Sequence, residues 1–393
     1  MADQSKPQLT LLLIGKTGMG KSRTGNSILG RLAFQVSGNT QSETTSTDWN
    51  IREYKQTLIK VVDVPGVGDT RFGLNFVITR IKEAMLLCPD GYDGFLYVCR
   101  YGGRFTGGDV QVMKYLKMIF GENFVRNWCT LVLTGGDNFD NDHGGTQMTF
   151  EEWCRNQTSI FKELTEESGE RIVLFDNVTK EESKKTKQLD ALLDLVRELR
   201  QRNDNKTYTN SDFESARALR SRDMNKQDKL FEKVSLLIQK SQERRGSFNM
   251  DKLLNLSSDC TQILLSLKKE KEPKFWKKMA DRLEEMKNLT DSLGHVYSLL
   301  PTEKKNHGIV DLEITIAEQC LEAKTNDVDL TLREYKRLQW KKLAVLVGSL
   351  VLAIVAGGAI VPAAVLTAPP AVKGVAGVVG AAVGLVRRQL LRF

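Results

Sequence analysis

Short apolar runs alternate with amphipathic stretches over the first half of the chain. The apolar runs begin at residues 9, 58, 94, 129 and 171, and each ends in small or polar residues. Between several of them lie stretches with apolar residues at helical spacing, at 76–87, 109–121 and 186–202. This alternation predicts an α/β fold, in which a mostly parallel sheet carries helices on both faces.

The pattern changes after a polar stretch at residues 202–212. We therefore predict a first domain over 1–212 and a helical or coiled-coil extension over 213–342. In the extension, apolar residues recur at spacings of three, four and seven, which indicates amphipathic helices. The first such set is Leu230, Val234, Leu237 and Ile238, and the second is Trp276, Met279, Leu283, Met286, Leu293 and Val296. A bundle that buries these faces is the plain interpretation, and a groove for a specific partner is the alternative.

The C-terminal tail is uncharged from Leu343 to Val372. Its first part, 343–361, is long enough for a membrane-spanning helix. Three prolines follow, and then a second apolar arm that ends at Val386. We predict that 343–386 anchors the protein to an intracellular membrane from the cytosolic side. Basic residues flank both ends of the tail, which favours a hairpin over a single span. A Gly/Ala-rich helical hairpin buried in the fold or in an oligomer is the remaining alternative.

Composition narrows the classes of partner. The 393 residues suffice for two or three compact units, and the formal net charge is +8. Lysine and arginine are mixed with acidic residues, and aromatic and basic residues do not interleave, so we expect nucleotide phosphates or an anionic membrane surface rather than nucleic acid. The six cysteines form no C-x-x-C pair, which disfavours a disulfide framework and a zinc site. With no signal-peptide pattern at its start, the first domain is expected in the reducing cytosol.

The stretch "GKTGMGKS" follows the first apolar run and fits the spacing of a phosphate-binding loop. Glycines let the backbone N–H groups approach phosphate oxygens, Lys21 can reach the β- and γ-phosphates, and Ser22 can ligate Mg²⁺ at the start of a helix. A chance glycine-rich turn is the alternative, which the strand before and the helix after disfavour. The predicted phosphate-binding set is Gly15, Lys16, Thr17, Gly18, Met19, Gly20, Lys21, Ser22 and Arg23.

Three later motifs follow apolar runs in the order that a GTP site needs. In "VVDVPGVGDT", Asp63 can hold Mg²⁺ through water, and the Gly66 N–H can sense a γ-phosphate. In "LVLTGGD", Thr134 and Asp137 are predicted nucleotide-binding residues, and the carboxylate of Asp137 can accept hydrogen bonds from the guanine ring N–H and amino groups. Asn177 in "LFDN" can supply the remaining base contact. Each motif alone could be a turn, but together they predict a site for GTP or GDP with Mg²⁺.

In order along the chain, these motifs together with "RYGGRFTGGD" and "YTN" resemble the GIMAP (immune-associated nucleotide-binding, AIG-type) GTPases over about residues 9 to 212. "RYGGRFT" looks like the box that separates this family from Ras-like and septin-like relatives. The resemblance implies a P-loop GTPase domain that forms dimers or oligomers face to face across the nucleotides. It also implies that Thr44 is the switch threonine that meets Mg²⁺ and the γ-phosphate, with Thr40 and Thr45 as alternatives.

The chain departs from related patterns at the position after Gly66. Val67 stands where Ras-like enzymes carry a water-positioning glutamine, so a solitary domain is expected to hydrolyse GTP slowly. A partner subunit could supply the missing charge, and Arg104 is the candidate, although it could equally be an ordinary surface or salt-bridged arginine. Gly135 in "TGGD" and the second "TGGD" at 106–109 also depart from the family pattern.

Three classes of function follow from these observations. The first is a membrane-anchored GTPase switch or scaffold whose slow hydrolysis depends on self-association of the nucleotide domains. The second is a GTP-binding scaffold with negligible hydrolysis whose helical region recruits effector proteins. The third is an effector in which nucleotide-driven assembly lets the tail bend or perforate a bilayer, as its closely spaced glycines would allow.

Overall fold

We analysed the protein as a computed structural model. It describes residues 7–36, 47–66, 73–103, 105–146, 148–220, 222–242, 250–270, 273–299 and 310–355. The chain divides into two compact units, and we describe each by itself. One holds Gln8–Trp49 and Lys60–Arg220, and the other holds Asn50–Ile59 and Ser221–Gln339.

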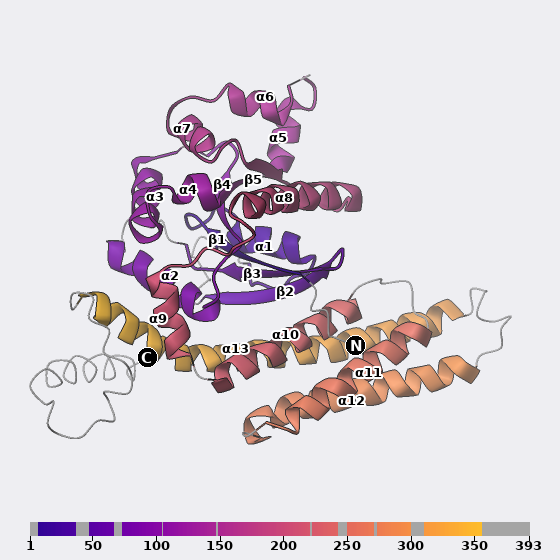
Figure 1. The fold of residues 1–393 in the computed structure, drawn as a ribbon. Helices are drawn as coiled ribbons and strands as arrows, with labels where there is room; N and C mark the ends of the chain where they lie inside the picture. Colours follow the sequence, from indigo (N-terminus) through magenta and orange to yellow (C-terminus); the bar gives the residue numbers. More distant parts are fainter. Residues whose placement is uncertain are drawn as a thin grey trace, which may run out of the picture. The chain divides into compact units, whose positions relative to one another are not determined.

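A six-stranded sheet forms the core of the first half of the chain (Figure 1). The order of its strands is β2-β3-β1-β4-β5-β6, and β1, β4, β5 and β6 pair in parallel. The central strands are buried almost throughout, as their uninterrupted apolar runs predict. The strands are β1 Gln8–Ile14, β2 Asp48–Tyr54, β3 Thr57–Asp63, β4 Gly94–Arg100, β5 Cys129–Thr134 and β6 Ile172–Phe175.

The chain first adds β2 and β3 on one side of β1 and then adds β4, β5 and β6 on the other side, so the direction of winding reverses at β1. With right-handed crossovers, this reversal places helices on both faces. Helix α8 contacts α1 and packs on β4, β5 and β6, while α3 contacts both α2 and α4. The helices here are α1 Lys21–Leu29, α2 Gly73–Leu87, α3 Gly107–Phe120, α4 Phe124–Trp128, α5 Gly136–His143, α6 Phe150–Arg155, α7 Ser159–Glu167, α8 Glu182–Arg202 and α9 Ser211–Leu219. The predicted α/β fold is confirmed.

The "YTN" stretch fastens the end of α8 to the first half of the chain. The Tyr208 hydroxyl donates to the carbonyl oxygen of Phe120 at 3.0 Å, and its main chain bridges to Tyr92. The Asn210 side chain then accepts from the Asp212 and Phe213 amides, which caps α9. The stretch is therefore an ordered connection, and the compact unit that contains the sheet extends to Arg220.

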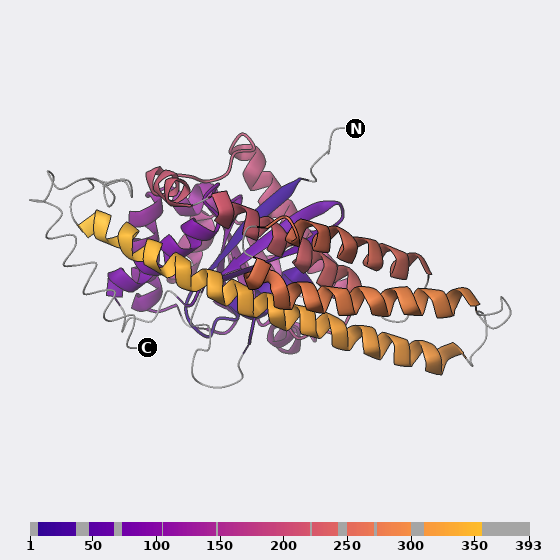
Figure 2. The ribbon, with the colours of Figure 1, turned by 90° about the horizontal axis from the view of Figure 1, so that it is seen from below.

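The helical unit contains α10 Arg222–Gln242, α11 Met250–Leu267, α12 Pro273–Leu299 and most of α13 Val310–Val355 (Figure 2). Its core is aromatic at the centre: the Trp276 ring lies 5.4 Å from that of Phe231 and 5.3 Å from that of Tyr335. Most residues of the two predicted apolar faces are buried. Leu293 is only half-buried, and the side chain of Val296 lies outside the described residues.

The predicted tail is mostly outside the described residues. Its first part forms the end of α13, and the residues from 356 onward are not described. Among the helices that the structure describes, none has an apolar stretch long enough to cross a membrane. The membrane anchor at 343–386 therefore stays a prediction.

Candidate nucleotide-binding site

The loop after β1 lies in close contact with two neighbouring segments, strand β4 and the loop after β3. Gly15 has a φ of 140°, and a Cβ there would overlap the carbonyl oxygen of Val98 in β4. Gly66, in the loop after β3, lies so close to Thr17 that a Cβ would overlap its main chain and hydroxyl. Only glycine fits at these two positions. The structure thus brings the two glycine motifs together, as a shared phosphate site requires.

Lys21 and Asp63 lie buried behind this loop. Lys21 is 7% exposed, and its Nζ donates to the carbonyl oxygen of Lys16 at 2.8 Å. Asp63 is 1% exposed, and its Oδ2 accepts from the Ser22 hydroxyl at 2.5 Å.

The pKa values of both groups are shifted by burial. Burial lowers the pKa of Lys21 to about 8, although the negative charge of Asp63 opposes this shift. Burial likewise raises the pKa of Asp63 to about 6, although Lys21 and Ser22 oppose this shift. Burial therefore disfavours the charged forms of both side chains. A ligand with an anion beside Lys21 and a cation beside Asp63 would stabilise these charges.

One oxygen of Asp63 is available to a cation. Its Oδ1 is buried and has no hydrogen-bond partner among the described residues. Carboxylate and hydroxyl oxygens suit Mg²⁺, so Asp63 and Ser22 fit a Mg²⁺ site. Within the described ranges, no group of three or more acidic, histidine or cysteine side chains could hold a metal. Two side chains would hold Mg²⁺ poorly alone, so phosphate oxygens and water molecules would complete its coordination.

The raised pKa of Asp63 predicts a pH dependence. Below about pH 6 the carboxyl group is protonated in the folded protein, and protons then compete with Mg²⁺ for it. We expect the gain in GDP affinity on adding Mg²⁺ to shrink as the pH falls through about 6, and to be fully present near pH 7.5. Fluorescence titration with and without Mg²⁺ measures this gain. Asp63→Asn supplies the background, and a gain in the parent that is equal at pH 5 and pH 7.5 would contradict the assignment.

At the other end of the site, the loop after β5 packs on the phosphate loop. The Thr134 hydroxyl donates to the carbonyl oxygen of Met19 at 2.9 Å. Gly135 then turns the chain with a φ of 87°, and half-buried Asp137 lies in the first turn of α5. A Cβ on Gly136 would lie 3.0 Å from the main-chain nitrogen of Asp176. The structure therefore places Asp137 beside the loop after β6, as a base site requires.

The side chain of Asn177 is already engaged. Its Oδ1 accepts from Ser27 at 2.7 Å, and its Nδ2 donates to Thr24 at 3.0 Å. Asn177 therefore ties its loop to α1, a role that the sequence did not predict. Asp176 shapes the same loop: its carboxylate accepts from two following amides and pairs with Lys184 at 2.7 Å. Burial opposes ionisation of Asp176, but the bond from Lys184 and those amides hold its pKa below the ordinary value.

Lys16 joins the phosphate loop to residues 100–109, "RYGGRFTGGD", which we call the box segment. Its Nζ donates to Thr106 at 2.7 Å and pairs with Asp109 at 2.5 Å. Asp109 also accepts from the Thr106 main-chain N–H and forms the capping box of α3. Sequence reasoning missed this contact, although T-x-x-D before an apolar helix is a capping signal. The box segment is thus fastened to the residues that would surround a phosphate.

Several predicted site residues lie outside the described residues: Thr44 and its alternatives Thr40 and Thr45, Val67 and Arg104. Their roles stay predictions. Arg23 lies in α1 and is exposed, whereas Lys21 and Asp63 are buried. The structure therefore describes the residues predicted to bind the phosphates and the base, but not the predicted switch threonine or Arg104.

Comparisons with known proteins give the family of the chain. Residues 9–255 match the AIG1 family. Immune-associated nucleotide-binding protein 9 of Arabidopsis thaliana is 31% identical over 237 residues, which make up 60% of this chain and 68% of that protein. Immune-associated nucleotide-binding protein 13 of the same plant is 35% identical over 205 residues, 52% of this chain and 59% of that protein. The chain thus covers between 59% and 68% of the length of these two relatives.

Solved structures give a weaker likeness. Toc33 from Arabidopsis thaliana in complex with GDP and Mg²⁺ is 22% identical, with 49% of this chain and 85% of that chain covered. Its TM-score is 0.36. A likeness this low carries no argument about the ligands of this chain.

Proposed function

The chain belongs to the AIG1 family, and on that premise we propose that it binds GTP and GDP with Mg²⁺ and hydrolyses GTP slowly. One observation carries the proposal. Behind a glycine loop lie a buried lysine, a serine hydroxyl and a buried aspartate whose second oxygen has no partner within the described residues. A bound phosphate and its cation would supply the charges that this arrangement lacks.

Each described side chain has a definite task in this proposal. Lys21 would exchange the carbonyl oxygen of Lys16 for phosphate oxygens, and the N-terminus of α1 would face the same charge. Asp63 and Ser22 would hold Mg²⁺, which when bound neutralises charge on the phosphates. Asp137 would select guanine, because its carboxylate accepts from two donors that adenine does not present together. Asn177 would act by holding its loop against α1 rather than by contacting the base with its side chain.

Hydrolysis is proposed to depend on encounter between two copies of the chain. Val67 cannot orient water, so a lone domain lacks a residue for that task. We expect the turnover per molecule to rise with protein concentration. Arg104→Ala should flatten that rise and leave GTP affinity nearly unchanged, because a residue that acts in trans contributes only in the transition state. Phosphate release across a range of protein concentrations measures both effects.

Arg155→Ala is the matched control, since this exposed arginine in α6 lies outside the box segment. It should behave like the parent. Turnover that does not change with concentration, and is the same in the Arg104 variant, would instead support a GTP-binding scaffold with negligible hydrolysis.

The tail is proposed to hold the protein on an intracellular membrane with the nucleotide domain in the cytosol. The support is the uncharged run from Leu343 to Val372 and the basic residues on both sides of the tail. Deleting 343–393 should move the protein from the membrane fraction to the soluble fraction. A tag after Phe393 distinguishes the topologies, because protease reaches it from the cytosol only if the tail is a hairpin. Full-length protein that stays soluble and monomeric without detergent would contradict the anchor and favour a buried helical hairpin.

A further inference from the structure

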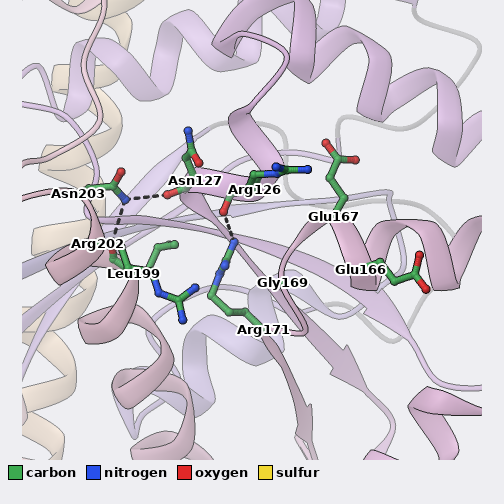
Figure 3. Close-up of a pocket in the computed structure, with 9 residues that line it drawn as sticks. All are labelled: Arg126, Asn127, Glu166, Glu167, Gly169, Arg171, Leu199, Arg202 and Asn203. Atoms are coloured by element: carbon green, nitrogen blue, oxygen red, sulfur yellow. Dashed lines mark hydrogen bonds between the residues drawn. The ribbon is translucent and has the colours of Figure 1, made fainter.

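A second cluster of cationic side chains lies at the other edge of the sheet. The phosphate loop follows the carboxyl end of β1, whereas this cluster lies where the parallel strands β5 and β6 begin, at Cys129 and Ile172. Here α4, α8 and the turn before β6 surround a cavity of about 390 Å³ (Figure 3). The residues that matter for the argument are Arg126, Asn127, Arg171, Arg202 and Asn203.

Arg171 is the buried member of the cluster, with only 3% of its surface exposed. Its Nε donates to the carbonyl oxygen of Cys129 at 3.1 Å, and its Nη2 donates to those of Val125 and Arg126 at 3.2 and 2.5 Å. These acceptors carry no net charge. Within the described residues no carboxylate forms an ion pair with Arg171, although the charge of Glu198 opposes the lowering of its pKa. The third nitrogen, Nη1, takes no part in the hydrogen bonds above. Burying a guanidinium without an ion-pair partner is costly.

The neighbouring arginines increase this excess of positive charge. Burial lowers the pKa of Arg171, and repulsion from Arg202 adds to this shift, while Cys129 and Glu198 oppose it. Arg126 and Arg202 are exposed at the mouth of the cavity, and neither forms an ion pair within the described part of the chain. The acids at the rim are already paired: Glu167 with Lys117 at 2.7 Å, and Glu166 with Lys162 at 3.8 Å. Three guanidinium groups therefore border one cavity, and the two carboxylates in its lining both pair with lysines outside that lining.

We propose that this cavity binds a phosphomonoester. Guanidinium groups bind phosphate oxygens through paired N–H donors, and a doubly charged phosphomonoester matches several cations better than a carboxylate or a phosphodiester does. Asn203 is already committed, because it donates to the carbonyl oxygens of Asn127 and Leu199. The side chain of Asn127 has no such bond among the described residues and is available as a further donor. The volume suits a small phosphorylated molecule rather than phosphate alone.

The phosphomonoester could be free, as in a sugar or glycerol phosphate, or the headgroup of phosphatidic acid in a membrane. Both present the same terminal phosphate, so both are probed. Glycerol 3-phosphate is titrated by calorimetry into the full chain, and flotation is measured with phosphatidylcholine vesicles that contain phosphatidic acid. Vesicles with phosphatidylserine serve as the charge control. Every titration is repeated with Lys21→Ala, which separates this site from the phosphate loop.

The variants are Arg126→Gln and Arg202→Gln, since exposed positions can be changed without removing the main-chain bonds of Arg171. Each is expected to weaken glycerol 3-phosphate binding at least about 10-fold, as loss of a charge-assisted hydrogen bond predicts. Arg197→Gln is the matched control: it removes the same charge from α8, at an arginine that pairs with Asp194. It should bind like the parent, and Lys21→Ala should too.

Binding to both probes, or to phosphatidic acid vesicles alone, supports the site, and the second result identifies a lipid headgroup as the source. The proposal is overturned if neither probe binds the parent, or if Arg126→Gln and Arg202→Gln bind as the parent does. It is also overturned if binding is lost in Lys21→Ala and kept in the arginine variants, because the phosphate loop would then account for it.

Discussion

Replacing Lys21 with alanine is expected to weaken GTP binding by roughly one to two orders of magnitude, since a charged contact to phosphate contributes about 1.5–3 kcal/mol. The structure holds the Lys21 side chain buried at the phosphate loop, where its Nζ donates to the carbonyl oxygen of Lys16. Removing it also takes away a positive charge that favours the ionised form of buried Asp63. Calorimetric titration with GTP and Mg²⁺ measures the loss.

Arg155→Ala is the matched control for that variant. It removes a positive charge from an exposed position in α6, outside the predicted phosphate-binding set. Its GTP affinity should stay within about threefold of the parent, because exposed charges contribute little. A Lys21 variant that binds GTP as tightly as the parent, while Arg155→Ala also does, would show that this loop is not the phosphate site.

Changing Asp137 to asparagine is expected to reverse the preference for guanine. The asparagine amide can donate where the aspartate only accepted, so the site should disfavour guanine and accept xanthine, which presents a carbonyl oxygen at that position. Loss of a hydrogen bond to a charged group, about 1.5–3 kcal/mol, predicts a loss of GTP affinity of about 10- to 100-fold. Competition between GTP and XTP for the variant reads the change directly.

Asp142→Asn controls for the loss of negative charge on α5. Its carboxylate accepts from the Tyr101 hydroxyl at 3.0 Å, so it has a separate structural task. That variant should keep the preference of the parent for GTP. If the Asp137 variant also prefers GTP over XTP, the base contact lies elsewhere.

The phosphate end of the site could be predicted from sequence because its requirements are local. Glycine at positions 15 and 66 is demanded by close approach of the backbone, and a lysine and a serine must follow at fixed spacing. The strands that carry these loops were equally clear, since buried parallel strands are continuous apolar runs. The strand that we predicted at residue 94 matches β4 as observed, and the membership of the AIG1 family confirms the resemblance drawn from the motifs.

Other parts escaped prediction for identifiable reasons. Strand β2 joins β3 through Lys55 and Gln56, which both have positive φ angles. Hairpin turns of this kind usually contain glycine or asparagine, and neither residue stands at this turn, so it could not be predicted. The bond from Lys16 to Asp109 joins residues 93 positions apart, and the contacts of Asn177 with α1 span about 150. Periodicity and local motifs cannot reveal contacts between residues so distant in the chain.

The central claim is that the chain is a guanine-nucleotide-binding protein that uses Mg²⁺. The measurement that tests it most directly is calorimetric titration of the purified protein, freed of nucleotide, with GDP, GTP and ATP in the presence and absence of Mg²⁺. We predict that GDP and GTP bind, that Mg²⁺ tightens their binding, and that ATP binds at least about 100-fold more weakly, as unpaired buried donors and acceptors require. Binding of ATP as tight as that of GTP, or no binding of any of the three, would contradict the account.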